Sequence, residues 1–193
     1  MRITDSRYDR DRLRLAVAYR LIGHEARTHT IRQCTGLSAD RIRKLFRDYV
    51  RTQPELSVRR RRGKSPRQMD FFRRSAALEM EAAAVASLLR ACALLARPGL
   101  LHRPTLEEVT RFCDAYETFR TVCPGTAITF EHAWYLRHAL AVHDEYELAH
   151  CRDCHALWVR DTLGIERAIC PACRWPEPSL ASLPPAVEVA RGC

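Results

Sequence analysis

Two C-x-x-C pairs near the C-terminus, separated by fifteen residues, constrain this 193-residue chain more than any other feature of its sequence. Their members are Cys151, Cys154, Cys170 and Cys173. Each pair can present two thiolates to one ion from a tight turn, and the intervening segment is long enough to form a hairpin that brings the pairs together. The sequence therefore predicts one structural Zn²⁺ ion in a four-cysteine zinc ribbon over residues 147–174.

Other uses of these cysteines fit the spacing less well. Two unrelated buried or redox-active pairs would need two coincidences of spacing, and four thiolates leave no open position for a catalytic water. His150 and His155 flank the first pair and could replace a cysteine as ligand, so this alternative stays open. Short strands are expected at residues 156–161 and 166–170, on either side of Gly164.

Length and composition place the chain among globular intracellular proteins. Its 47% apolar content is sufficient for a packed core of one ordinary domain with a small added module. The N-terminus has neither an apolar run nor a small-residue cleavage site, so the cysteines indicate a reducing compartment, the cytoplasm. The most apolar stretch, residues 82–96, is interrupted by Arg90 and is too short to span a membrane. No membrane association is expected.

Basic residues are concentrated in one part of the chain. The formal net charge is +9, and between residues 41 and 74 there are thirteen Arg or Lys but only three acidic residues. Such a segment favours a polyanion as partner, because each neutralised phosphate releases counterions. A solvated charged face or a flexible basic loop would have the same composition. The interpretation therefore depends on the motif that contains these residues.

The N-terminal part of the chain, residues 1–57, has the layout of a helix-turn-helix. Apolar residues recur at three- and four-residue intervals over residues 12–22, as on one face of a helix. A second helix is expected over residues 25–34, after which Gly36 supplies a left-handed turn and Ser38 can cap a third helix. One residue departs from the usual pattern, because Arg32 stands where a small residue is common.

The third helix has one apolar face and one basic face. Ile42, Leu45, Phe46 and Tyr49 are spaced to pack inward. The residues left to face outward are Arg41, Arg43, Lys44, Arg47 and Arg51. The guanidinium group of arginine can form paired hydrogen bonds with a guanine edge or with a phosphate, and a helix of this size fits the major groove. We therefore expect binding to duplex DNA through this helix, and the alternative is an ordinary helical pair with a hydrated basic face.

A basic linker is expected over residues 58–70, where apolar periodicity is absent. Its basic residues are Arg59, Arg60, Arg61, Arg62, Lys64 and Arg67. Side chains of this kind can lie along the DNA backbone without reading its sequence. We expect this linker to be mobile and to contribute phosphate contacts.

A helical core is expected over residues 71–146. Its first helix should start at Phe71 and Phe72 and end before Pro98 and Gly99. This helix is rich in alanine and apolar on more than one side, which is typical of a helix buried centrally or at a subunit interface. The fold class is therefore mainly α, with a helix-turn-helix, a helical core and a small C-terminal zinc ribbon.

Two further helices complete the predicted core. Thr105 and Glu108 form a capping-box pattern that opens one of them. The last helix is expected over residues 129–145, directly before the first cysteine pair. Four of the ten prolines lie in the tail, residues 175–193, which we expect to be disordered.

No motif in the chain supports an enzyme. A glycine-rich phosphate loop, G-x-S-x-G, H-E-x-x-H and an acidic pair suited to acid–base work are all missing from the sequence. The cysteines outside the two pairs are Cys34, Cys92, Cys113, Cys123 and Cys193. The first four lie on or near apolar helical faces, where a cysteine is usually a small core residue. Neither catalysis nor a small-molecule substrate is expected.

The order of these parts resembles the FlhC family, the larger subunits of the bacterial flagellar master regulator FlhDC. The resemblance runs from residue 12 to residue 173, and its most distinctive segments read L-S-A-D-R-I-R-K-L-F-R-D, D-A-Y-E-T-F-R-T-V-C-P, E-H-A-W-Y-L-R-H-A-L, C-R-D-C and C-P-A-C. It implies a structural zinc on the four paired cysteines and transcriptional activation at flagellar class II promoters. The implied partners are promoter DNA, FlhD and RNA polymerase.

Two other classes of protein share some of these features. A recombinase or transposase accessory factor can combine a helix-turn-helix with a zinc ribbon, but a catalytic acidic triad cannot be assembled here. A zinc-stabilised scaffold could use the basic segment to bind RNA or an acidic protein. Competition between duplex DNA and RNA would separate this scaffold from a promoter-binding subunit.

Overall fold

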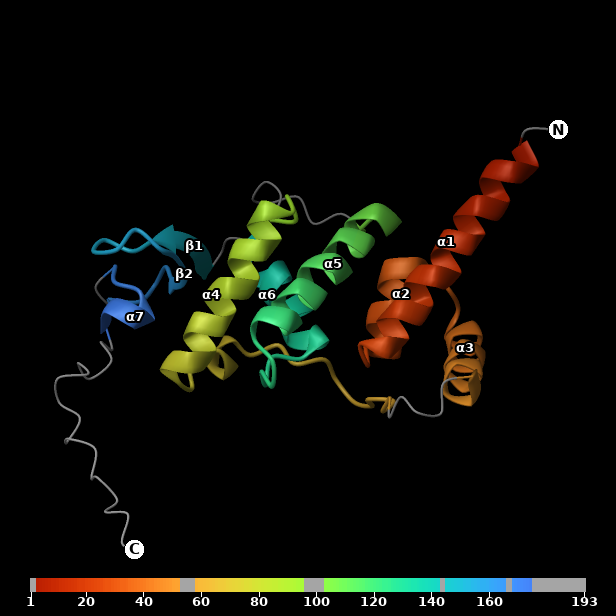
Figure 1. Ribbon diagram of the computed structural model, residues 1–193, viewed down its shortest axis with the longest axis horizontal. Coiled ribbons are helices and arrows are strands. Elements are labelled where there is room, and N and C mark those ends of the chain that lie inside the picture. Colours follow the sequence, from red (N-terminus) through yellow and green to blue (C-terminus); the bar gives the residue numbers. More distant parts are fainter. Residues whose placement is uncertain (1–2, 53–57, 96–102, 143–144, 166–167, 175–193) are drawn as a thin grey trace, which may run out of the picture.

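The computed structural model describes residues 3–52, 58–95, 103–142, 145–165 and 168–174, and in these residues the chain is mainly helical. Three groups of elements follow one another along an elongated body (Figure 1). The N-terminal group contains α1 (Ile3–Gly23), α2 (Thr28–Thr35) and α3 (Ala39–Thr52). The middle group contains α4 (Ala76–Ala91), α5 (Leu106–Val122) and α6 (Phe130–Val142). The C-terminal group contains β1 (Tyr146–His150), β2 (Leu157–Asp161) and α7 (Pro171–Arg174).

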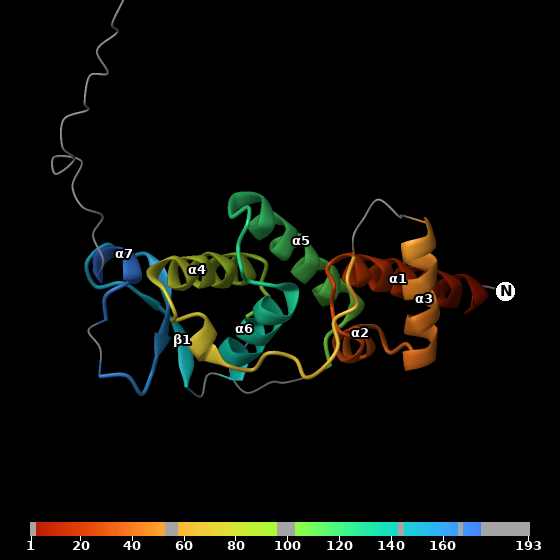
Figure 2. The same cartoon turned by 90° about the horizontal axis from the view of Figure 1, so that it is seen from below.

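The expected helix-turn-helix is present in α2 and α3. Gly36 has φ +74° and donates its N–H to the carbonyl of Arg32, which ends α2 in the left-handed turn that the sequence predicts. Ser38 caps α3, because its hydroxyl accepts the N–H of Arg41 at 3.2 Å. Arg32 itself is exposed, so a large side chain is accommodated at this position. Helix α3 contacts both α1 and α2 and crosses α1 steeply (Figure 2).

Two boundaries in this group differ from the expectation. Helix α2 begins at Thr28 rather than Glu25, because Glu25 has φ +57° and interrupts the helical backbone. Helix α1 begins at Ile3, nine residues before the expected start, so its first half extends past the other helices (Figure 1). Leu13, which the periodicity assigned to the inner face, is 43% exposed on this extension.

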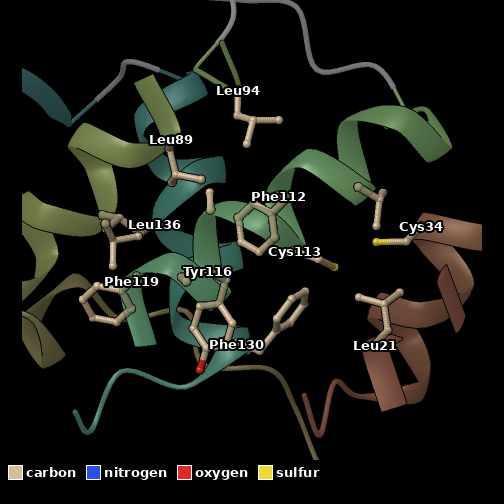
Figure 3. Close-up of a cluster of buried hydrophobic side chains, with 14 of the residues drawn as sticks. Leu21, Cys34, Leu89, Leu94, Phe112, Cys113, Tyr116, Phe119, Phe130 and Leu136 are labelled. Carbon is tan, nitrogen blue, oxygen red and sulfur yellow. The ribbon is translucent and has the colours of Figure 1, made fainter. Parts of the chain in front are cut away.

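Helices α4, α5 and α6 surround a core that is rich in aromatic side chains. Phe112 meets Phe130 edge to face with ring centroids 5.2 Å apart, and Tyr116 meets Phe130 in the same way at 5.3 Å. Leu21 of α1 and Cys34 of α2 extend toward the same cluster from the N-terminal group (Figure 3). The helix-turn-helix and the middle helices therefore share one continuous hydrophobic core.

Helix α4 is shorter than predicted at its start. A 3₁₀ turn at Met69–Phe71 precedes it, and the helix begins only at Ala76 because Ser75 caps it by accepting the N–H of Leu78. It ends at Ala91, and the predicted stop at Pro98 and Gly99 lies outside the described residues. Helices α5 and α6, strand β2 and helix α7 all contact it. Its apolar surface is thus used within the chain.

The other two predicted helices form largely as expected. Thr105 accepts the N–H of Glu108 while the Glu108 carboxylate accepts the N–H of Thr105, so the predicted capping box opens α5. Helix α6 covers Phe130–Val142, within the predicted range of 129–145. The predicted disordered tail, residues 175–193, lies outside the described residues.

The two strands of the C-terminal group form an antiparallel hairpin, with Tyr146 opposite Asp161 and His150 opposite Leu157. One strand was predicted correctly at residues 156–161, but its partner was not. The partner is β1, which lies before the first cysteine pair, whereas residues 168–170 of the second predicted strand are not in strand conformation. Among the residues that the structure describes, no helix combines the length and the apolar character needed to cross a membrane.

Candidate metal centre and nucleic-acid interface

The four predicted cysteine ligands lie together at the end of the molecule formed by β1, β2 and α7 (Figure 1). Their Sγ atoms are all within 4.8 Å of one another, and those of Cys154 and Cys170 are 3.5 Å apart. A tetrahedral zinc site with Zn–S distances of about 2.3 Å has sulfur atoms about 3.8 Å apart. The spacing of the two pairs thus correctly predicted a cluster that can hold a metal ion.

Backbone hydrogen bonds form the turn around the first pair. Strand β1 ends just before Cys151, whose N–H donates to the carbonyl of Ala156 at 2.8 Å, and the N–H of His155 donates back to Cys151 at 3.1 Å. His155 has φ +60°, which this tight turn requires after its second cysteine. A further bond, from the N–H of Arg152 to the carbonyl of Ala168 at 2.9 Å, joins this turn to the second pair.

The electrostatics of the cluster favour a bound cation. Backbone N–H groups of Cys154 and Cys170 lower the pKa of Cys151 to about 6, and the Cys170 N–H lies 3.2 Å from the Cys151 sulfur. The thiols of Cys154 and Cys170 raise the pKa of Cys173 to about 12. The backbone therefore stabilises the thiolate of Cys151, whereas the neighbouring thiols oppose ionisation of Cys173. A divalent metal ion would favour the thiolate form of both, and its binding would release protons.

The two flanking histidines do not join the cluster. His150 and His155 are both exposed, and the ring Nδ1 of His150 lies 3.0 Å from the carbonyl oxygen of His155. In the described residues, the group of side chains that can hold a metal consists of the four cysteines. Four thiolates would complete the coordination of such an ion, so the arrangement suits a structural centre.

The metal centre is attached to α4 by Trp158 and by ion pairs. Trp158 is 4% exposed and packs against Cys151 and Cys170, and the guanidinium of Arg174 lies 5.6 Å from the centre of its ring. Arg174 also pairs with Glu79 of α4 at 3.6 Å, and Arg73, which precedes α4, pairs with Asp161 of β2 at 3.1 Å. The geometry of the cysteines is thereby coupled to the packing of the helical core.

The predicted DNA-binding residues of α3 all lie on its exposed face. Arg41, Arg43, Lys44, Arg47 and Arg51 are exposed, whereas Ile42 and Leu45 are buried on the opposite side. Arg43 pairs with Asp40 at 2.6 Å, and Arg51 lies 3.5 Å from Asp48. Within the described residues, the other three cations of this face have no ion-pair partner. They remain available to an external anion.

The predicted linker residues lie on a separate segment, residues 58–67, which we call the basic strap. Its six cations Arg59, Arg60, Arg61, Arg62, Lys64 and Arg67 are exposed. The strap does not run free of the body, because the N–H of Arg59 and the guanidinium of Arg61 both donate to Glu25. Arg61, predicted as a phosphate contact, thus already has an acidic partner in the chain.

Two acidic residues that the sequence analysis did not identify hold the helix-turn-helix in place. Glu131 of α6 is 3% exposed and accepts the N–H of Arg27 at 2.8 Å and the hydroxyl of Thr30 at 3.0 Å. The carboxylate of Glu117 of α5 accepts hydrogen bonds from two nitrogens of the Arg20 guanidinium, and this contact lowers the pKa of Glu117. Burial of a carboxylate at the start of a helix compensates unpaired N–H groups. Neither residue belongs to a recognisable spacing pattern.

Of the described cysteines outside the cluster, Cys34 and Cys113 are buried in the core, whereas Cys92 and Cys123 are half-buried beside it. Burial raises the pKa of Cys34 to about 12 and has the same effect on Cys113. Such thiols stay protonated, which makes them poor nucleophiles. Both side chains lie at the contact between α2 and α5 (Figure 3).

The arrangement as a whole combines a four-thiol metal centre with a cationic helix face at the far end of the same chain (Figure 1). Comparison with known proteins adds no family assignment. No protein-family model matches the chain, and no characterised protein matches it in sequence.

Proposed function

We propose that this protein is the DNA-binding subunit of a transcriptional activator, with α3 as its recognition helix. The observation that carries the proposal is the display of five basic side chains on the one face of α3 that faces solvent, directly after a glycine turn. A basic helix in this position is the part of a helix-turn-helix that enters the major groove.

The five basic residues of α3 can be divided into those with an acidic partner in the chain and those without one. Arg41, Lys44 and Arg47 have no acidic partner in the described part of the chain, so these three would approach base edges. Arg43 and Arg51 are paired within α3 and would contact phosphates only by leaving Asp40 and Asp48. Helix α3 has 14 residues and is therefore about 21 Å long, which suits one passage through the groove.

The metal centre has a structural part in this proposal. Zn²⁺ is the ion that a cage of four thiolates favours, because it accepts tetrahedral sulfur coordination without redox chemistry. The four cysteines would hold it, and the ion would fix the hairpin against α4 without contacting DNA. The proposal assigns no catalytic step and no small-molecule substrate to the chain.

The resemblance to the FlhC family supports the finer part of the proposal. We assign the chain a companion subunit of the FlhD type, flagellar class II promoters as targets, and contact with RNA polymerase in the cytoplasm. Sequence segments from α3, α5, α6 and both cysteine pairs carry this resemblance. A zinc-stabilised scaffold that binds RNA is the competing function, which the following experiment would detect.

A selection experiment tests DNA binding without knowledge of the target. The full chain, alone and with an FlhD-type subunit, is used to enrich duplexes from a random-sequence pool. Arg47→Gln should then weaken binding to the enriched duplex by about 5- to 150-fold, the equivalent of about 1–3 kcal/mol for a bidentate base contact. Arg90→Gln removes the same charge from an exposed site on α4 and should change binding less than about twofold.

Three outcomes would contradict the proposal. Failure to enrich any duplex at low salt would exclude DNA binding by this complex. Equal losses for Arg47→Gln and Arg90→Gln would show that α3 does not read the duplex. Preferential binding of RNA over the same DNA sequence would favour the scaffold function instead.

A further inference from the structure

The connection between α1 and α2 holds the basic strap against the body of the protein. The Glu25 carboxylate accepts the backbone N–H of Arg59 at 3.0 Å and the side-chain Nε of Arg61 at 2.8 Å. A second nitrogen of the Arg61 guanidinium lies 2.7 Å from the same oxygen, Oε2, so this oxygen accepts from Arg61 while Oε1 accepts the N–H of Arg59. Two residues further on, the Arg27 guanidinium donates to the carbonyl of Arg62.

Glu25 is the left-handed residue that ends α1. Its φ of +57° is uncommon for a residue with a side chain and costs on the order of 1 kcal/mol. The turn is stabilised by its neighbours, because the N–H of Glu25 donates to Ile22 at 2.9 Å and that of Ala26 donates to Leu21 at 3.0 Å. The carboxylate is only 22% exposed, so water screens its pair with Arg61 less than it screens a surface ion pair.

The four consecutive arginines of the strap are therefore not equivalent. Arg61 is committed to Glu25, whereas Arg59, Arg60 and Arg62 have exposed side chains. In the described ranges of the chain, no acidic side chain pairs with the guanidinium groups of these three residues. They are exposed cations on a backbone that is held at Arg59 and Arg62.

We infer that Glu25 is a positioning residue for DNA binding. It anchors the strap so that Arg59, Arg60 and Arg62 face a phosphate backbone together, and it keeps Arg61 out of phosphate contact. This inference rests on the proposed function. Preordered cations lose less conformational entropy on binding, whereas a released strap would bind any duplex as a flexible polycation.

Glu25→Gln removes the charge of the anchor with little change of shape, and Glu107→Gln removes one charge from an exposed site on α5 as a matched control. The anchor is tested on the free chain by amide hydrogen exchange at Arg59, measured by NMR. Because glutamine keeps an oxygen that can accept the Arg59 N–H, exchange is measured in Glu25→Ala, where it should become at least about fivefold faster, and it should stay within about twofold in the control. A melting temperature that is at most slightly below that of the wild type shows that the variants are folded.

The effect on DNA binding is measured as the salt dependence of the affinity for a random-sequence duplex. Release of Arg61 adds one phosphate contact, so the slope of log K against log salt should steepen by about 0.9 in Glu25→Gln. Between 50 and 200 mM salt this is an extra loss of affinity of about 3.5-fold. Arg60→Gln should make the slope shallower by about 0.9, and Arg61→Gln by less than half of that.

Each unfavourable result has a distinct meaning. Unchanged exchange at Arg59 in Glu25→Ala would overturn the anchor itself. Equal slope losses in Arg60→Gln and Arg61→Gln would overturn the inference that Arg61 is withheld from phosphates. If the wild-type chain binds no duplex, both the proposed function and the positioning role are overturned. Faster exchange at Arg59 in the Glu25 variant would then show that Glu25 is an anchor with a structural role alone.

Discussion

Replacing Glu131 by alanine tests how the helix-turn-helix is held on the helical core. The carboxylate is 3% exposed and accepts two hydrogen bonds, from the N–H of Arg27 at 2.8 Å and from the hydroxyl of Thr30 at 3.0 Å. Both donors lie at the start of α2, whose cap residue Arg27 provides no side-chain hydrogen bond of its own. The buried acid of α6 thus pairs the N–H of the cap residue and the hydroxyl of Thr30, and it ties the start of α2 to the helical core.

The magnitude follows from these two bonds. A hydrogen bond to a charged group contributes about 1.5–3 kcal/mol, and an unpaired buried donor costs a similar amount. Because removal of the carboxylate also relieves its own burial cost, we expect Glu131→Ala to lower the free energy of unfolding by about 2–4 kcal/mol. Glu131→Gln keeps one acceptor oxygen and should lose about half of this amount.

Urea denaturation followed by circular dichroism, with zinc in excess, measures the loss. Glu107→Ala is the control, because Glu107 is exposed at the start of α5 and its removal should change the unfolding free energy by less than about 0.5 kcal/mol. A Glu131→Ala protein within about 0.5 kcal/mol of wild type would refute the reasoning. The start of α2 would then be stabilised by water or by packing alone.

Three further predictions address other parts of the molecule. Cys151→Ser should reduce bound zinc well below one ion per chain and yield poorly soluble protein, and full zinc occupancy by elemental analysis would contradict this. Gly36→Ala should lower the unfolding free energy by about 1–2 kcal/mol in urea denaturation, because its φ is +74°, a conformation that alanine rarely adopts; no loss would show that the turn relaxes. Burial and neighbouring arginines lower the pKa of His132 to about 4, so between pH 6.5 and about 4 the unfolded chain binds a proton that the folded chain does not. Stability should therefore fall as the pH decreases through this window, and His132→Phe, measured by denaturation at several pH values, should flatten the decrease.

The features that the sequence predicted are those set by local spacing. The distance between two C-x-x-C pairs, the glycine after α2 and the pattern of Thr105 and Glu108 each act within a few residues or one hairpin, and each appears in the structure. The fold class, mainly helical with a small sheet beside the cysteines, followed from the same local patterns.

Features that depend on distant residues were missed. Strand β2 pairs with a segment on the far side of the first cysteine pair, and nothing in the composition of residues 166–170 excluded the wrong partner. Glu25 accepts a hydrogen bond from a residue 34 positions away, and Glu131 accepts one from a residue 104 positions away. A single acidic residue forms no periodic pattern, so the sequence does not indicate such contacts. The start of α4 is different, because it has local signals: Ser75 is a typical cap residue, and Glu79 is an acidic residue in the first turn.

The seating of β2 and α7 on α4 has a consequence for biosynthesis. Ala82, Val85 and Ala86 of α4 are buried, and part of their surroundings comes from the last described stretch of the chain. A nascent polypeptide that has left the ribosome up to α6 therefore still exposes one flank of α4 to water, and it covers this flank only after the second cysteine pair has emerged. A chain in which the cysteine cluster does not close would keep this flank of α4 exposed and would become a substrate for chaperones and proteases.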